Sequence, residues 1–195
     1  AASPDGAWLV SGHLDGSLRL WDAKTYAMIA EFDTDLGAVM ACAVSQDGCR
    51  FLAGGSEGSL VLWNAFPIQA ISQTPPQNAE ILSCDLDPQC LYAVTGGADG
   101  SVVLWSIGSS LTRAASWDTP APVHCCRFSP DGQRILTAHS DGSLRLFIIS
   151  NNKEGLSVMA HDYEALSCAF SPDGTQLVSG GMDGLVKTWK ADALE

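Results

Sequence analysis

The sequence predicts an all-β protein built from repeated four-stranded antiparallel sheets. Three markers recur every 42 residues along the 195-residue chain. An acidic residue followed by glycine lies six positions before an aromatic residue, and a turn that reads Ser-Pro-Asp-Gly or a variant of it precedes both. The aromatic positions are Trp21, Trp63, Trp105, Phe147 and Trp189. Three markers in one register indicate a tandem array, in which the repeating unit determines the fold.

The unit 166–190 shows each expected element in order. Its first run, LSCAF, is rich in strand-forming residues and ends at the turn SPDG. A second run, QLVSG, leads to an Asp-Gly pair, which supplies the positive φ that a tight hairpin requires. A third run, LVKTW, follows, and a fourth lies between units, as TYAMIAEF does over 25–32. Each unit is therefore expected to form a four-stranded antiparallel meander.

The third run of each unit is apolar at successive positions. These runs read SLRLW, SLVLW, SVVLW, SLRLF and LVKTW, and several of them do not alternate between apolar and polar residues. Such runs favour strands that are covered on both faces. Sheets stacked one against the next would provide that cover.

The combination of SPDG, SGG, MDG and Trp in a unit of about forty residues resembles the WD-repeat family. This resemblance covers the whole chain and implies a β-propeller, in which four-stranded blades surround a central channel. Only Trp21-Asp22 keeps the Trp-Asp dipeptide itself, and the other units read WN, WS, FI and WK.

The chain is predicted to be one propeller domain, 1–195, with five units. Their approximate bounds are 1–36, 37–78, 79–120, 121–162 and 163–195. Five complete units would need 210 residues, so the first unit is expected to lack most of its innermost strand and the last unit its outermost strand. Open sheet edges pair with other chains or aggregate. We therefore expect a fragment of a larger propeller, whose edges are capped by further blades or by a partner.

Charge and cysteine usage narrow the classes of function. The net charge of −12 disfavours binding to nucleic acid or to anionic membranes, and no apolar run is long enough to span a bilayer. Cys42, Cys84, Cys126 and Cys168 share one repeat position and are interpreted as small core residues. With no CxxC spacing, the seven cysteines are expected to be reduced thiols in an intracellular protein, cytoplasmic or nuclear.

The family resemblance also implies a buried hydrogen-bonded tetrad in each unit. Only the last unit has all four members, His161, Ser179, Asp183 and Trp189. The His161 and Asp183 pair is interpreted as structural, not catalytic, because a buried polar network is useful when each member is satisfied. The sequence offers no nucleophile elbow, phosphate loop or metal-ligand spacing, so no catalytic residue, cofactor or metal is expected.

The remaining candidates lie on a surface. In related propellers, partners dock on the face that carries the loop before the first strand and the turn between the second and third strands. Leu14 and Met182 are apolar residues at such turn tips, and this favours an interaction surface. The positions near the start of the first strand, with the acidic residues two places earlier, are Met40, Leu82, His124, Leu166, Glu80 and Glu164. Plain alternation would bury Met40, Leu82 and Leu166, whereas a bulge would turn them outward.

We expect a non-catalytic scaffold that binds other proteins or peptides through this apolar and acidic face. One alternative is a sensor or autoinhibitory propeller inside a large multidomain signalling protein. Another is a ubiquitin-ligase substrate receptor, although Trp21-Asp22-Ala23-Lys24 has Lys where that class has Arg.

Overall fold

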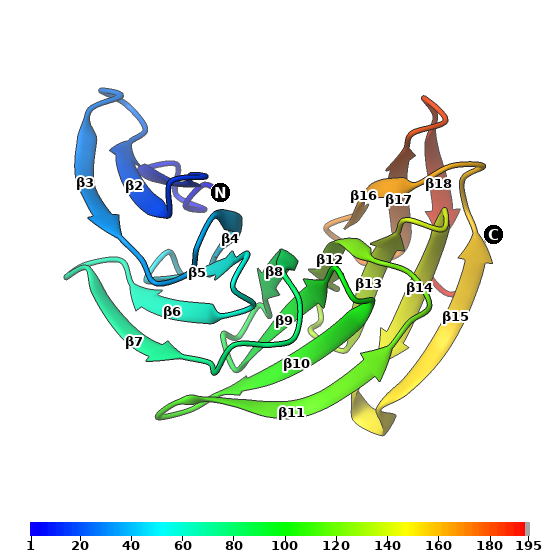
Figure 1. Cartoon of the computed structure of the whole chain (residues 1–195). Helices are drawn as coiled ribbons and strands as arrows, with labels where there is room; N and C mark the ends of the chain where they lie inside the picture. The colour runs from blue at the N-terminus through cyan, green and yellow to red at the C-terminus, as the bar shows by residue number, and fades with distance from the viewer. Residues whose placement is uncertain (194–195) are drawn as a thin grey trace.

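Five antiparallel sheets follow one another along the chain and fan around a common centre (Figure 1). The structure is a computed structural model, and it describes residues 1–193. The sheets form an arc that is open between the first and the last sheet, with β4, β8, β12 and β16 nearest its centre. The predicted all-β class and the blade arrangement are confirmed.

The strands occur in sequence order in every sheet, as expected for meanders. The first sheet contains β1 (Trp8–Gly12), β2 (Ser17–Asp22) and β3 (Met28–Asp33). The second contains β4 (Val39–Val44), β5 (Arg50–Gly55), β6 (Leu60–Asn64) and β7 (Gln69–Gln73). The third contains β8 (Ile81–Leu86), β9 (Tyr92–Gly97), β10 (Ser101–Ile107) and β11 (Leu111–Asp118). The fourth contains β12 (Val123–Phe128), β13 (Arg134–His139), β14 (Ser143–Ile148) and β15 (Lys153–Met159). The fifth contains β16 (Ala165–Phe170), β17 (Gln176–Gly181) and β18 (Val186–Lys190).

The first and last sheets each have three strands within the described residues, as the sequence predicts. In the first sheet, a single bridge between Ala2 and Leu9 stands where the innermost strand would be. One turn of 3₁₀ helix, η1 (Ile149–Asn151), interrupts the strands of the fourth sheet. Over residues 1–193, no helix has the length and hydropathy needed to cross a membrane.

The hydrophobic core consists of four clusters, and each cluster lies between two consecutive sheets. Packing on both faces explains why the residues of β6 are apolar at successive positions. Leu60 and Leu62 pack against the third sheet, while Val61 and Trp63 pack against the first. Because both faces of such a strand are covered, the pattern need not alternate. The cores therefore hold each blade to its neighbours.

Candidate functional site

A β-bulge occurs near the start of the innermost strand in the second, third, fourth and fifth sheets. The register shifts between Val39 and Ala41, and it shifts in the same way at the three equivalent places. The extra residue of a bulge is left out of the ladder, which re-aims its side chain. The four bulged residues are Met40, Leu82, His124 and Leu166. Alternation alone would have buried them, and the bulges turn them towards solvent.

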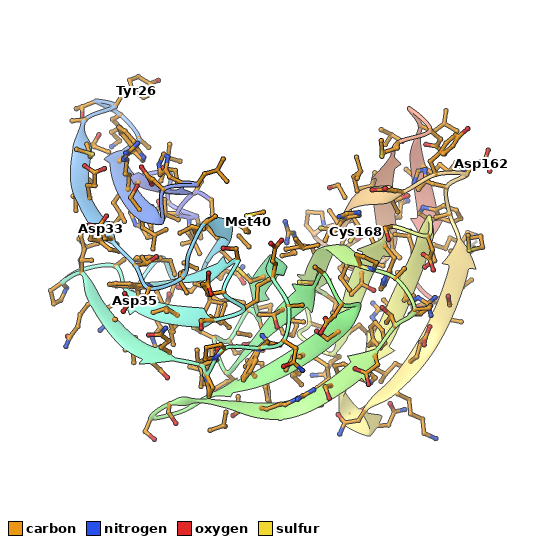
Figure 2. All side chains as sticks on the ribbon, in the orientation of Figure 1. Tyr26, Asp33, Asp35, Met40, Asp162 and Cys168 are labelled. Carbon is orange, nitrogen blue, oxygen red and sulfur yellow. The ribbon has the colours of Figure 1, made fainter. Side chains whose placement is uncertain are left out.

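These four residues meet around one hollow on the inner side of the arc. The hollow has a volume of about 260 Å³, and its wall also includes Arg127 and the small residues that follow each bulge. Figure 2 shows Met40 at the inner edge of the arc, where β4 faces the centre. The bulges thus bring side chains from four blades to a single place.

The turn tips are tied to the loops that precede the innermost strands. The N–H of Met182 donates to the carbonyl oxygen of Glu164 over 2.8 Å, and the N–H of Ala98 donates in the same way to Glu80 over 2.9 Å. Met182 is 61% exposed and Leu14 is 82% exposed. The turn tips and the bulges therefore belong to one end of the blades, which we call the bulge face.

A side-chain hydrogen bond crosses from one blade to the next on the bulge face. His124 Nε2 lies 2.9 Å from Glu164 Oε2, and both side chains are partly exposed. The structure thus brings Met40, Leu82, His124 and Leu166 together and joins Glu164 to them. Leu14, Glu80 and Met182 lie outside the wall of the hollow.

The predicted tetrad residues form a continuous chain of hydrogen bonds in the fifth blade. Trp189 Nε1 donates to Ser179 Oγ over 3.0 Å, and Ser179 Oγ lies 2.8 Å from His161 Nε2. His161 Nδ1 lies 2.9 Å from both carboxylate oxygens of Asp183. Because a carboxylate only accepts, Nδ1 carries a proton and donates it to Asp183, while Nε2 is paired with the Ser179 hydroxyl. Every member is satisfied, which fits a structural role.

The carboxylate of this tetrad stays ionised although burial opposes it. Hydrogen bonds from the Leu185 N–H and from His161 hold the pKa of Asp183 below its usual value of 3.8. The Lys187 ammonium lies 3.8 Å away and adds a positive charge nearby.

Two histidines that the sequence did not assign take the place of His161 in other blades. In the fourth blade, His139 Nε2 lies 2.7 Å from Thr137 Oγ1, and His139 Nδ1 lies 3.3 Å from the carbonyl oxygen of Ala121. Burial lowers the pKa of His139, so the ring is neutral. In the first blade, His13 lies 2.9 Å from Ser11, to which Trp21 donates.

The residue at the end of the second strand indicates whether the histidine ring comes from the loop or from the strand itself. In the fifth blade this residue is Gly181. A Cβ on Gly181 would lie 2.5 Å from the His161 ring. A side chain at that position and a histidine in the preceding loop therefore exclude each other. His13 and His139 stand at the equivalent positions, so their rings come from the strand end and not from the loop.

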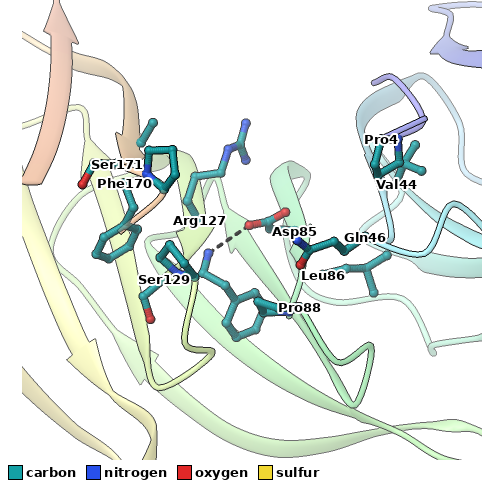
Figure 3. Close-up of a pocket in the computed structure, with 14 residues that line it drawn as sticks. Pro4, Val44, Gln46, Asp85, Leu86, Pro88, Arg127, Ser129, Phe170 and Ser171 are labelled. Atoms are coloured by element: carbon teal, nitrogen blue, oxygen red, sulfur yellow. Dashed lines mark hydrogen bonds between the residues drawn. The ribbon is translucent and has the colours of Figure 1, made fainter. Parts of the chain in front are cut away.

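The opposite end of the blades carries a separate cavity of about 510 Å³, and residues of the Ser-Pro-Asp-Gly turns line part of it (Figure 3). Asp85 Oδ2 accepts the backbone N–H of Phe128 over 2.9 Å, from β8 across to β12. Burial raises the pKa of Asp85, and the Arg127 guanidinium acts against this rise. Arg127 itself donates to the carbonyl oxygen of Cys126 over 2.7 Å. The bond to Asp85 joins the third and fourth blades, whereas the bond from Arg127 stays within β12.

Over residues 1–193, no three His, Cys, Asp or Glu side chains are arranged to hold a metal ion. The bulge face presents apolar side chains, one histidine and flanking carboxylates.

A comparison with protein-family models identifies the repeat. The model of the WD domain, G-beta repeat, matches residues 1–22, 28–64, 69–106, 112–147 and 153–190. The chain belongs to the WD40 family. A comparison with curated protein sequences gave no significant match.

The WD40 repeats and the blades are offset by one strand. The repeat over 28–64 begins with β3, which is the outermost strand of the first sheet, and continues through β6 of the second sheet. Each of the last four WD40 repeats thus completes the sheet before it, which links consecutive blades through the chain itself.

Proposed function

We propose that this WD40 domain is a non-catalytic scaffold that binds a protein segment on its bulge face. WD40 repeat domains are generally interaction scaffolds, and this generality supports the class of function. The observation that carries the proposal is the set of four bulges, which turn the same repeat position outward around one hollow. A fold needs no such repetition for its core, because bulged side chains leave the ladder.

The chemistry of the bulge face indicates the kind of segment that it binds. Met40, Leu166 and Met182 are exposed apolar side chains. Glu164 lies beside Met182, and Glu80 holds the equivalent position in the third blade. The chain also carries a net charge of −12. A complementary segment presents apolar side chains with lysine or arginine beside them, since opposite charges steer association and fix orientation.

The proposal can be tested with a random-peptide library displayed on phage and selected on the wild-type domain. We expect enriched peptides to combine apolar and basic residues. Met182→Ser and Leu166→Ser should each weaken their binding at least tenfold, as loss of a central apolar contact does. Raising the salt concentration should slow association, because the carboxylates are exposed to solvent.

Leu91→Ser is the matched control. Leu91 is also an exposed apolar residue, but it lies at the Asp87–Tyr92 turn, at the other end of the blades. Its change should leave binding within twofold of wild type. The proposal fails if Leu91→Ser weakens binding as much as Met182→Ser and Leu166→Ser. It also fails if those two variants lose their far-UV circular dichroism, because the residues would then support the fold.

A further inference from the structure

Two adjacent cysteines of β12 face opposite neighbours. Cys126 Sγ lies 3.9 Å from the carbonyl oxygen of Val94 in the third blade. Cys125 Sγ lies 3.6 Å from the carbonyl oxygen of Cys168 in the fifth blade. Successive side chains of a strand point to opposite sides, so the two thiols of this pair belong to different interfaces.

The repeat brings residues 43 positions apart into contact between innermost strands. Ser83 Oγ accepts the backbone N–H of Cys126 over 3.1 Å at one such contact, and Ala41 packs in the same cluster as Cys84 at another. The contact between the fourth and fifth blades holds Cys125 and Cys168. Here Cys168 Sγ lies 4.0 Å from the carbonyl oxygen of Cys125, so each sulfur lies against the backbone of the other residue. Both residues are free thiols.

The surroundings of the two thiols differ. A hydrogen bond from the Cys168 thiol lowers the pKa of Cys125 although burial opposes this, and the positive charge of Arg127 acts in the same direction. The same hydrogen bond, together with burial, raises the pKa of Cys168. Cys125 is only 4% exposed, but it is one of the residues that line the hollow of the bulge face. A lowered thiol pKa is characteristic of reactive cysteines, and the hollow beside Cys125 is the route by which a small oxidant would approach.

We propose that Cys125 and Cys168 form a redox-modification site, in which a hydroperoxide converts the two thiols into a disulfide between the fourth and fifth blades. The Cys125 thiolate attacks one oxygen of hydrogen peroxide. An S–O bond forms, the O–O bond breaks, and the leaving hydroxide takes up the proton that the Cys125 thiol released on ionisation, which gives water. The Cys168 sulfur then attacks the sulfenic sulfur, an S–S bond forms, and the S–O oxygen leaves as a second water with the Cys168 proton. The two thiols supply the two electrons that peroxide takes up.

The disulfide would join β12 to β16 directly beneath the bulged residues His124 and Leu166. It would close a loop of 43 residues, and such closure removes conformational freedom from the unfolded chain. Oxidation would therefore fix the fourth and fifth blades to each other at the edge of the hollow. This inference does not depend on the proposed partner, because it rests on the contact between the two cysteines.

The test uses the whole chain treated with hydrogen peroxide, blocked with a maleimide, and digested for mass spectrometry without reduction. We expect a peptide pair cross-linked through Cys125 and Cys168. The oxidised chain should melt about 10 °C higher than the reduced chain, and dithiothreitol should reverse the shift. Ser83 stands at the position equivalent to Cys125 in the third blade, so Cys125→Ser should fold normally. This variant should show neither the cross-link nor the rise in melting temperature.

Cys49→Ser and Cys126→Ala are the controls for other thiols. Cys49 is exposed, and Cys126 is adjacent to Cys125 but faces the third blade. Both variants should keep the Cys125–Cys168 cross-link. The proposal is overturned if the cross-link joins Cys125 to Cys126 or joins two chains through Cys49. It is also overturned if peroxide carries Cys125 to the sulfinic acid with Cys168 still free.

Discussion

The indole of Trp63 shows how much one hydroxyl group matters inside a blade. In the first, third and fifth blades, the equivalent tryptophan donates to Ser11, Thr95 or Ser179. The second blade has Ala53 at that position, and Trp63 Nε1 is buried with no partner among the described residues. An unsatisfied buried donor costs about 1–3 kcal/mol.

Ala53→Thr should therefore stabilise the domain. The new hydroxyl would accept the Trp63 N–H as Thr95 accepts that of Trp105, with a gain of about 1 kcal/mol. The free energy of unfolding can be measured by urea titration. Ala53→Val adds the same volume without an acceptor and should give no gain. If Ala53→Thr stabilises equally in a Trp63→Phe background, the hydrogen bond is not the cause.

The source of the histidine ring in each blade could not be predicted from the sequence. The sequence correctly indicates which positions repeat, but it assigns the histidine role only to the loop position of His161. His139 fills the same space from the strand end, and its distance from Thr119 along the chain hides their contact of 3.3 Å. Which residue supplies the ring depends on the volume left by Gly181, and volume is a property of the packed blade.

The turn between the first and second strands is the element that repeats most closely. In the fifth blade, Asp173 Oδ1 accepts from the hydroxyl of Ser171 and from the N–H and hydroxyl of Thr175. These hydrogen bonds lower the pKa of Asp173 from 3.8 to about 2. The carboxylate thus acts as the acceptor around which the turn is built.

This arrangement predicts a defined response to acid. The folded pKa lies below the unfolded value, so the contribution to stability is complete above about pH 5 and is lost as the pH falls through 3.8 towards 2. Asp173→Asn should lower the melting temperature at pH 6, and the difference from wild type should shrink by pH 3. Asp33→Asn makes the same change in charge at an exposed strand end and should show no such trend. If the difference in melting temperature between wild type and Asp173→Asn stays constant with pH, the ionised Asp173 carboxylate is not the source of the stability.

The strands themselves were predictable, and their bulges were not. Alternation and the Asp-Gly hairpins indicate where each strand runs, because they reflect local backbone preferences. The bulge at Leu82 adds one residue to an otherwise ordinary apolar run, ILSCDL, and no residue type there requires it. The direction of Leu82 therefore followed only from the structure.

At the scale of the molecule, one repeat position can be buried or exposed according to its neighbours. Val186 of β18 is 76% exposed, whereas the equivalent Leu18, Leu60, Val102 and Leu144 are all 0% exposed. Each of the four buried residues lies in the cluster between its own sheet and the next. The same apolar repeat position therefore contributes more to the free energy of unfolding where the next blade covers it than in β18, where it is exposed.

This difference can be measured with a matched pair of substitutions. Leu144→Ala should cost about 2–5 kcal/mol, because it leaves a cavity between the fourth and fifth blades. Val186→Ala should cost less than about 0.5 kcal/mol, as exposed positions generally do. Urea titrations of both variants, with gel filtration to follow association, provide the comparison. A large loss for Val186→Ala would show that this face is covered in solution.

The bulges have a consequence for how recognition can change. Because each bulged residue stands outside the ladder, its identity is uncoupled from strand register and from the four cores. The positions held by Met40, Leu82, His124 and Leu166 can therefore be exchanged as a set with little penalty to folding. The scaffold offers four variable sites on a constant frame, which suits both evolutionary drift of specificity and the engineering of new binders.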